Sequence, residues 1–231
     1  MNKYISLIRT RLIPALLSAV LITSLGACSS LTDKNEPLPS LFSVFATLES
    51  HSKTGAVFTV QSAPDAEPVT LTTNADLQAE GLEAGKRYII IYANGDANDP
   101  YIPGAIDLKN VLKVANGNVQ IATKQEIMAL QGVEYSVVSM FRTGTYINVQ
   151  LDIPSTSTPE VFNIYADRAT LGNPLPDLYL IYQVNSTGLS HTTAFGSFNI
   201  AEVWNERGCT GVNIDLNGRP SATFKKESTE K

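Results

Sequence analysis

From Leu41 onwards, the chain alternates between short apolar segments and turn residues. The first segments are rich in β-branched and aromatic residues or alternate apolar with polar positions, which is typical of strands. They span Leu41–Glu49, Thr54–Gln61, Pro68–Thr72, Arg87–Tyr92 and Ala105–Val114. Arg87–Tyr92 is expected to be a central strand buried on both faces, and the turn pair Asn94-Gly95 ends it. With almost no helical pattern between them, these five strands predict a small barrel in residues 41–118.

A second set of strands is predicted in residues 119–231. Thr123 followed by Glu126 is a capping-box pattern, so a short helix is expected over Lys124–Leu130. Seven segments of strand character follow, at Tyr135–Met140, Tyr146–Ile153, Val161–Tyr165, Leu178–Val184, Thr192–Asn199, Cys209–Leu216 and Ser221–Lys225. Gly144 and Asn217-Gly218 predict hairpin turns. The pattern favours an all-β protein whose second part is an immunoglobulin-like β-sandwich.

The first 27 residues have the pattern of a secretory signal. Lys3, Arg9 and Arg11 precede an apolar run, Leu12–Leu25, that would reach about 21 Å as a helix and is too short for the ~30 Å core of a bilayer. The run ends in Leu25-Gly-Ala-Cys28, which resembles a bacterial lipobox. The resemblance implies cleavage of residues 1–27 and lipid attachment at Cys28. An ordinary secreted protein with a cysteine at this position is the alternative.

Residues 28–40 are polar and carry two prolines, which is typical of a flexible tether between lipid and first domain. Ser29 and Ser30 follow the cysteine where an acidic residue would favour retention in the inner membrane. The expected location is therefore the outer membrane of a Gram-negative bacterium, with the periplasmic and the cell-surface face both open.

Charge argues against one class of partner. The signal carries three basic and no acidic residues, so its removal shifts the formal net charge from −5 to −8. An acidic surface repels phosphates, and nucleic acid is not an expected partner. Once Cys28 is lipidated, Cys209 is the one remaining cysteine, which rules out an internal disulfide and indicates a buried small hydrophobe in a strand.

Candidate chemistry is sparse. Asp96, Asn98 and Asp99 share one loop and could offer oxygen ligands to calcium, but the complete calcium-loop pattern is absent, and such loops commonly bond their own backbone. Ser190 and His191 are adjacent, so on a strand they would point to opposite faces, which argues against proton transfer between them. No zinc-ligand spacing is present. We therefore expect no catalytic residue, no metal site and no cofactor.

Two further groups of residues bear on binding or hydrolysis. Paired carboxylates for glycoside hydrolysis would come from acids near strand ends, but nothing selects a pair among Asp152, Asp167, Asp177, Glu202 and Asp215. The aromatic residues of the predicted barrel could form a stacking platform for a ligand, but their pattern is equally consistent with packing in the core. These residues are Phe42, Phe45, Phe58, Tyr88, Tyr92 and Tyr101. The cations near them are few: Lys53, Lys86, Arg87, Lys109 and Lys113. Trp204, the single tryptophan, is expected to pack in a turn rather than to form a ligand platform.

Several segments together resemble the NigD-like lipoproteins. Besides the lipobox, these segments are Gly85–Tyr92, Ile106–Leu112, Tyr146–Leu151, Asp177–Tyr182 and Ala194–Ile200. The resemblance covers nearly the whole chain after the signal. It implies an N-terminal OB-type barrel and a C-terminal β-sandwich, but it brings no catalytic or ligand-binding residues.

The hypothesis that fits best is a non-enzymatic outer-membrane lipoprotein that serves as a binding or assembly module for an envelope protein or glycan. An envelope polysaccharide or peptidoglycan hydrolase is the alternative from another class. A bacteriocin accessory or immunity protein is a third, and only the family's name favours it.

Overall fold

The structure is a computed structural model that describes residues 40–96, 98–130, 132–155, 161–183, 188, 190–216 and 219–227. The stretch Pro37–Lys231 forms one compact unit. Within the described ranges, no helix is both long enough and apolar enough to cross a bilayer. The signal segment, Cys28 and the tether up to residue 39 lie outside the described residues.

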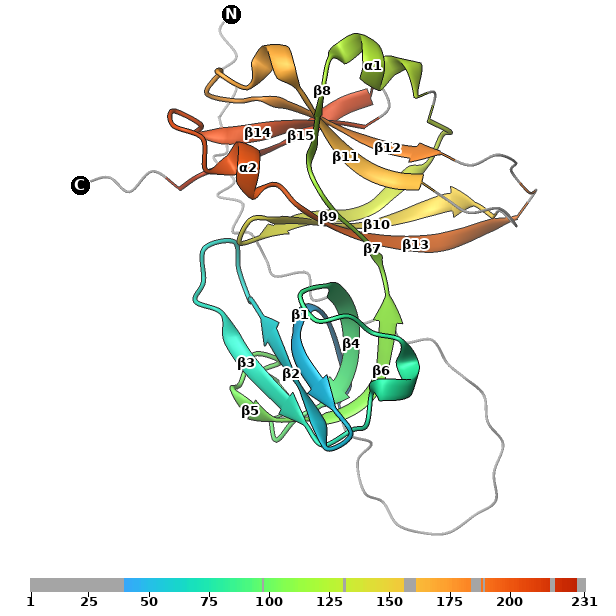
Figure 1. The fold of residues 1–231 in the computed structure, drawn as a ribbon, viewed down its shortest axis with the longest axis vertical. Coiled ribbons are helices and arrows are strands. Elements are labelled where there is room, and N and C mark those ends of the chain that lie inside the picture. Colours follow the sequence, from blue (N-terminus) through green and yellow to red (C-terminus); the bar gives the residue numbers. More distant parts are fainter. Residues whose placement is uncertain are drawn as a thin grey trace, which may run out of the picture. The chain divides into compact units, whose positions relative to one another are not determined.

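The first part of the unit, which we call the barrel region, is built on one six-stranded sheet (Figure 1, blue to green). Its order is β5-β3-β2-β1-β4-β6. The strands are β1 (Phe42–Ser52), β2 (Gly55–Val60), β3 (Val69–Thr73), β4 (Arg87–Ala93), β5 (Gly104–Ala105) and β6 (Asp107–Lys113), with one short 3-10 turn, Gln78–Glu80. All five predicted strands are present, and β4 lies between β1 and β6 with its side chains mostly buried, as expected for a central strand.

The predicted fifth strand is divided in two, and this division decides how the sheet curls. β5 pairs in parallel with β3, whereas β6 pairs antiparallel with β4, and only Ile106 separates them. The consecutive strands β5 and β6 therefore form the two opposite edges of the sheet. This strand order is that of an OB-type fold. The ladders do not close into a complete barrel, because the β5–β3 contact is limited to two residue pairs. The structure therefore has a partly open barrel instead of the simple five-stranded barrel that the sequence predicts.

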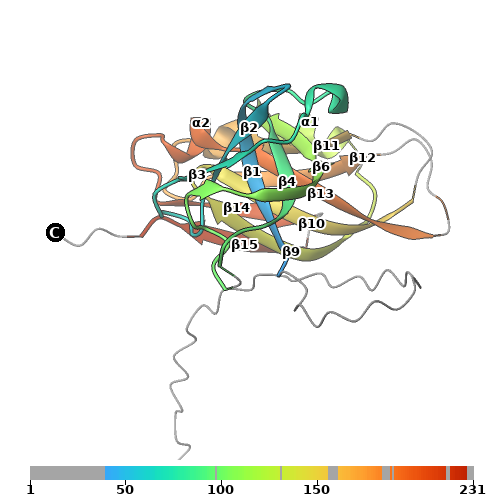
Figure 2. The same ribbon diagram turned by 90° about the horizontal axis from the view of Figure 1, so that it is seen from below.

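The second part, residues 115–227, is a β-sandwich, as predicted. One sheet has the order β7-β13-β10-β9 and the other β15-β14-β12-β11-β8. The first sheet comprises β7 (Ala115–Asn118), β9 (Ser136–Thr143), β10 (Tyr146–Pro154) and β13 (His191–Asn199). The second comprises β8 (Gln120–Ala122), β11 (Val161–Asp167), β12 (Asp177–Gln183), β14 (Gly211–Leu216) and β15 (Arg219–Lys225). Both views show β10 beside β13, as their ladder requires (Figures 1 and 2).

The alternation along β10 produces the sandwich core. Ile147, Val149, Leu151 and Ile153 are all fully buried, and they share one cluster with residues of β11, β12, β13 and β14. Helix α1 (Lys124–Ala129) carries the predicted capping box, because the Thr123 side chain accepts from the Glu126 backbone and the Glu126 carboxylate accepts from the Thr123 N–H. α2 (Ala201–Trp204) and the 3-10 turn Arg168–Thr170 complete the elements.

Three features of the sandwich depart from the sequence pattern. β7, β8 and β14 each pair in parallel with a neighbour, whereas immunoglobulin-like sheets are antiparallel. The turn-like residues Asn116-Gly117-Asn118 belong to β7, which pairs with β13, so the chain enters the sandwich before the expected boundary at residues 118 and 119. Gly144 adopts a left-handed φ of 54° in the predicted β9–β10 hairpin, while Asn217-Gly218 lies outside the described residues.

Candidate functional site

A buried arginine lies where the barrel region meets the sandwich. Arg87 is the first residue of β4 and is only 4% exposed. Its Nε donates to Ser197 Oγ at 3.1 Å, and Nη2 donates to Asn148 Oδ1 at 3.2 Å and to Thr143 Oγ1 at 3.4 Å. Nη1 donates to Thr47 Oγ1 at 3.2 Å. The guanidinium thus bonds mostly to the sandwich although its backbone belongs to the barrel region.

All four of these acceptors are neutral. Among the residues that the structure describes, no carboxylate lies within ion-pair distance of Arg87. Burial lowers the pKa of Arg87 to about 10, and the nearby Tyr146 opposes this shift. The guanidinium therefore stays charged at neutral pH. The Tyr146 ring, whose centroid lies 4.6 Å from the guanidinium carbon, gives further stabilisation through a cation–π contact.

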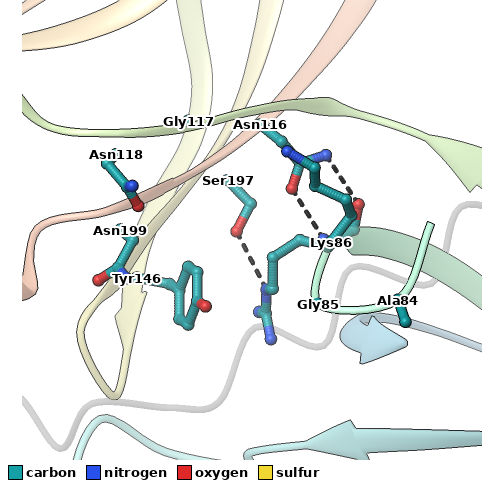
Figure 3. A pocket seen from close by; sticks show the side chains of 10 residues that line it. Ala84, Gly85, Lys86, Asn116, Gly117, Asn118, Tyr146, Ser197 and Asn199 are labelled. Carbon is teal, nitrogen blue, oxygen red and sulfur yellow. Dashed lines mark hydrogen bonds between the residues drawn. The ribbon is translucent and has the colours of Figure 1, made fainter. Parts of the chain in front are cut away.

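A pocket of about 230 Å³ opens beside this arginine (Figure 3). Its walls come from the loop before β4, from β7, and from the ends of β10 and β13. The lining residues are Ala84, Gly85, Lys86, Arg87, Asn116, Gly117, Asn118, Tyr146, Ser197 and Asn199. Tyr146 and Asn199 lie on one side of the view, while Lys86 and Asn116 lie on the other. The pocket is smaller than the roughly 300–1,000 Å³ of sites for drug-sized ligands, so it suits a single small group.

Hydrogen-bond donors without a partner gather in this pocket. Within the described part of the chain, the Lys86 ammonium, the Asn118 side chain, the Tyr146 hydroxyl and Asn199 Nδ2 have no hydrogen-bond partner. Asn199 uses its Oδ1 instead, accepting from Thr145 Oγ1 at 3.0 Å and from the Ala201 N–H at 2.9 Å. The pocket thus combines positive charge with free donors, which is the chemistry that recognises an anion or a carboxylate.

The backbone at the base of the pocket is fixed by Asn116. Its Oδ1 accepts from the Arg87 N–H at 2.8 Å, and its Nδ2 donates to the Arg87 carbonyl at 2.9 Å. This amide joins β7 to β4 as a paired strand residue would. The wall between barrel region and sandwich is therefore held by directed bonds.

A second buried arginine links the same two regions in the opposite direction. Arg142 of β9 is 3% exposed, and its Nη2 binds both carboxylate oxygens of Asp65, at 2.9 and 3.1 Å. Nη1 donates to the carbonyls of Pro64 and Gly144 at 3.1 and 2.5 Å. The Trp204 ring centroid lies 4.2 Å from the guanidinium carbon. Arg142 thus has a carboxylate partner, in contrast to Arg87 among the described residues, and its role is structural.

The loop with the candidate calcium ligands bonds its own backbone. Asp96 Oδ1 accepts from the Asn98 N–H at 2.8 Å, and Asp99 Oδ1 accepts from the Tyr101 N–H at 2.8 Å. Across the described residues, no group of three or more acidic, histidine or cysteine side chains could hold a metal ion. The described residues of the loop therefore use their carboxylates for turns.

The candidate catalytic residues do not form a nucleophile–base pair among the described residues. His191 Nδ1 lies 3.1 Å from Asp152 Oδ2, an exposed pair, whereas Ser190 Oγ contacts Ser155 Oγ at 2.6 Å. Asp167 and Asp177 flank the last pair of the β11–β12 ladder and so approach each other. Each has a structural bond, because Asp167 Oδ1 accepts from the Ala169 N–H at 3.0 Å and Asp177 Oδ1 accepts from Asn213 Nδ2 at 3.2 Å. Glu202 lies in the first turn of α2, and Asp215 lies in β14, so neither belongs to the pocket.

The other candidates are mostly core residues. Phe58, Tyr88 and Tyr92 are buried in the barrel core, and Phe42 and Tyr101 pack against it. Phe45 instead contacts the sandwich, with its ring centroid 5.8 Å from that of Phe141. Trp204 is buried in the sandwich core, which confirms its predicted packing role. Cys209 is buried as predicted, although β14 begins two residues later, at Gly211.

Sequence reasoning counted Lys86 and Arg87 only among the scattered cations of the barrel region. It missed their pocket because Asn116, Tyr146 and Ser197 come from strands far apart in the chain. The one available signal was a charged residue at the start of the most apolar segment, since an arginine that begins a buried strand must find buried partners.

No family model matches the sequence, and no curated protein is significantly similar to it. Several solved structures share the fold. A protein of unknown function, DUF1344, from Bacteroides vulgatus superposes with a TM-score of 0.63 at 15% identity, over 83% of this chain and 93% of that chain. A toxin-related protein from Parabacteroides distasonis gives a TM-score of 0.62 at 12% identity, over 82% of this chain and 95% of that chain.

A NigD-like immunity protein from Bacteroides caccae gives a TM-score of 0.53 at 14% identity, over 81% of this chain and 93% of that chain. At such low identities, the likeness concerns the fold and not the activity. The resemblance to the NigD-like lipoproteins that the sequence segments carry is therefore confirmed at the level of the fold.

Proposed function

We propose that the chain is a lipid-anchored protein of the bacterial outer membrane that binds an envelope protein or glycan without transforming it. The observation that carries the proposal is the Arg87 pocket. It offers a buried positive charge and free donors, yet no aspartate, glutamate, histidine or cysteine is among the described residues that line it. Hydrolases of glycosidic or peptide bonds generally need such groups as nucleophile, acid or base.

The lipid anchor is supported by the lipobox and the serines that follow Cys28. Fractionation of cells that express the protein tests the location. We expect the protein in the outer-membrane fraction, and protease treatment of intact cells then separates a surface-facing from a periplasmic protein. Recovery with the inner membrane would refute the proposed location.

The binding role is tested by affinity enrichment from detergent-solubilised membranes. The wild-type protein should enrich one partner reproducibly, whereas a bait of similar acidity and size should not. Failure to enrich any protein or polysaccharide above this control would count against a binding module.

An immunity role is the second candidate, and the observation that favours it is the shared fold with the NigD-like immunity protein. It predicts that deletion of the gene makes the cell sensitive to a toxin from neighbouring strains, and that the restored gene protects again. Equal sensitivity of deletion and wild-type strains across co-cultured neighbours would argue against this role.

A further inference from the structure

We propose that the Arg87 pocket binds the carboxylate of an acidic sugar residue, such as a uronic acid at the end of an envelope glycan. The inference rests on the proposed binding function and names its ligand chemistry. It starts from the fact that a buried charge normally has a partner of opposite charge. Arg87 has none among the described residues, although it lines an accessible pocket.

The bonds of Arg87 explain how its charge persists although no described residue supplies a counter-ion. Four of its five N–H groups are satisfied by neutral oxygens, so the guanidinium is held in place before any ligand arrives. Such preorganisation reduces the ordering cost of binding. The arginine supplies positive potential, and the exposed ammonium of Lys86 supplies a mobile charged donor at the rim.

The remaining donors suit the hydroxyl groups of a sugar. The Asn118 amide offers a donor and an acceptor together, as a hydroxyl group requires, and the Tyr146 hydroxyl lies in the same wall. Asn199 adds only the donor Nδ2, because its Oδ1 already accepts from Thr145 and Ala201. The volume of about 230 Å³ fits a single ring and not a longer chain within the pocket. One face of the Tyr146 ring is already covered by Arg87, so hydrogen bonds and charge determine recognition more than stacking does.

The negative net charge of the protein favours a ligand with a single carboxylate over a polyanion. The chain without its signal carries a formal charge of −8, which repels extended acidic polymers and nucleic acids. A saccharide with a single carboxylate is repelled only weakly at physiological ionic strength, because the Debye length is then only about 8 Å.

The test is isothermal titration calorimetry of the purified protein with glucuronate, glucose and inorganic phosphate. We expect glucuronate to bind with a dissociation constant in the millimolar range, as is usual for so small a ligand. Glucose should bind at least tenfold more weakly, because it lacks the carboxylate but has the same ring. Binding of glucuronate should also weaken as salt is added.

Variants at the rim keep the test independent of folding. Lys86→Ala and Asn118→Ala change exposed residues whose side chains have no partner among the described residues, and each should weaken glucuronate binding by roughly tenfold and severalfold, respectively. Lys53→Ala, which removes an exposed lysine outside the pocket, is the matched control and should leave the affinity unchanged. Circular dichroism verifies that all variants are folded.

Three results would overturn the inference: no heat of binding with glucuronate at tens of millimolar, equal affinity for glucose, or tighter binding of phosphate. Binding that is unaffected by both rim variants would place the site elsewhere. If an envelope partner is still enriched from membranes while glucuronate does not bind, the proposed binding function stands and only this ligand assignment fails. A short peptide with a free C-terminal carboxylate serves as a further probe, and its tighter binding would assign the pocket to a protein partner.

Discussion

The ion pair between Asp65 and Arg142 allows a direct test of how the barrel region and the sandwich are held together. Arg142 is 3% exposed and Asp65 is 50% exposed, so one partner is buried while the other remains half in water. The change that we consider is Asp65→Ala, which removes the carboxylate and leaves the guanidinium with the carbonyls of Pro64 and Gly144 and the ring of Trp204.

The expected magnitude lies between two limits. Exposed ion pairs contribute about 0–1 kcal/mol, whereas removing one partner of a fully buried pair costs about 3–5 kcal/mol. The two charge-assisted bonds from Nη2 strengthen the pair, while the hydration of Asp65 weakens it. We therefore expect Asp65→Ala to reduce the free energy of unfolding by about 1–3 kcal/mol, which lowers Tm by roughly 2–4 °C per kcal/mol for a unit of this size.

A double-mutant cycle with Arg142→Met isolates the pair from the other contacts of Arg142. Urea unfolding of the wild type, both single variants and the double variant should give a coupling energy of about 1–2 kcal/mol. High salt should reduce it only in part, because Arg142 is buried. A coupling energy below about 0.3 kcal/mol, or separate unfolding transitions for the two regions in the wild type, would refute the reasoning that this pair joins them.

Four further predictions test other parts of the chain. Cys28→Ala should abolish lipidation and move the protein from the membrane pellet to the soluble fraction, or leave it unprocessed, because stable anchoring requires more than one acyl chain; mature-size protein that stays with membranes after a carbonate wash would contradict this. Gly196→Ala should destabilise the sandwich by about 1–3 kcal/mol, because a Cβ there would lie 2.6 and 2.7 Å from ring atoms of Phe198 and Phe162, whereas Gly172→Ala meets no atom within 4 Å and serves as the control in thermal denaturation. Thr123→Ala should cost about 1 kcal/mol by removing the cap of α1. Hydrogen bonds from Thr123 lower the pKa of Glu126 in the folded protein. The stabilisation by this carboxylate is therefore present above the pKa of the unfolded state and is lost as pH falls through the pKa of the folded state. The difference in stability between the wild type and Glu126→Gln should shrink in acid, and a difference that does not depend on pH would contradict the assignment.

Local pattern was sufficient for most of the elements. β10 alternates apolar and polar residues because one face of the strand packs in the sandwich core, and β4 is apolar from Tyr88 onwards because both of its faces are covered. Each strand could therefore be recognised from its own residues. The capping box at Thr123 likewise depends on residues three positions apart. The division of the last barrel strand at Ile106 was not visible, because it arises from simultaneous pairing with β3 and β4.

Tertiary structure decided the role of polar residues. Asn116-Gly117-Asn118 has the composition of a turn, yet β13 offers a free edge that turns it into a strand, and the Asn116 side chain then bonds the Arg87 backbone. The sequence indicated Arg87 only as one of the few cations of the barrel region and did not single out Arg142, but the close approach of the two regions buries both. Only the distant residues that surround each arginine determine that Arg142 has a carboxylate partner whereas the described neighbours of Arg87 are neutral. Burial and charge pairing are properties of contacts that the order of residues along the chain does not specify.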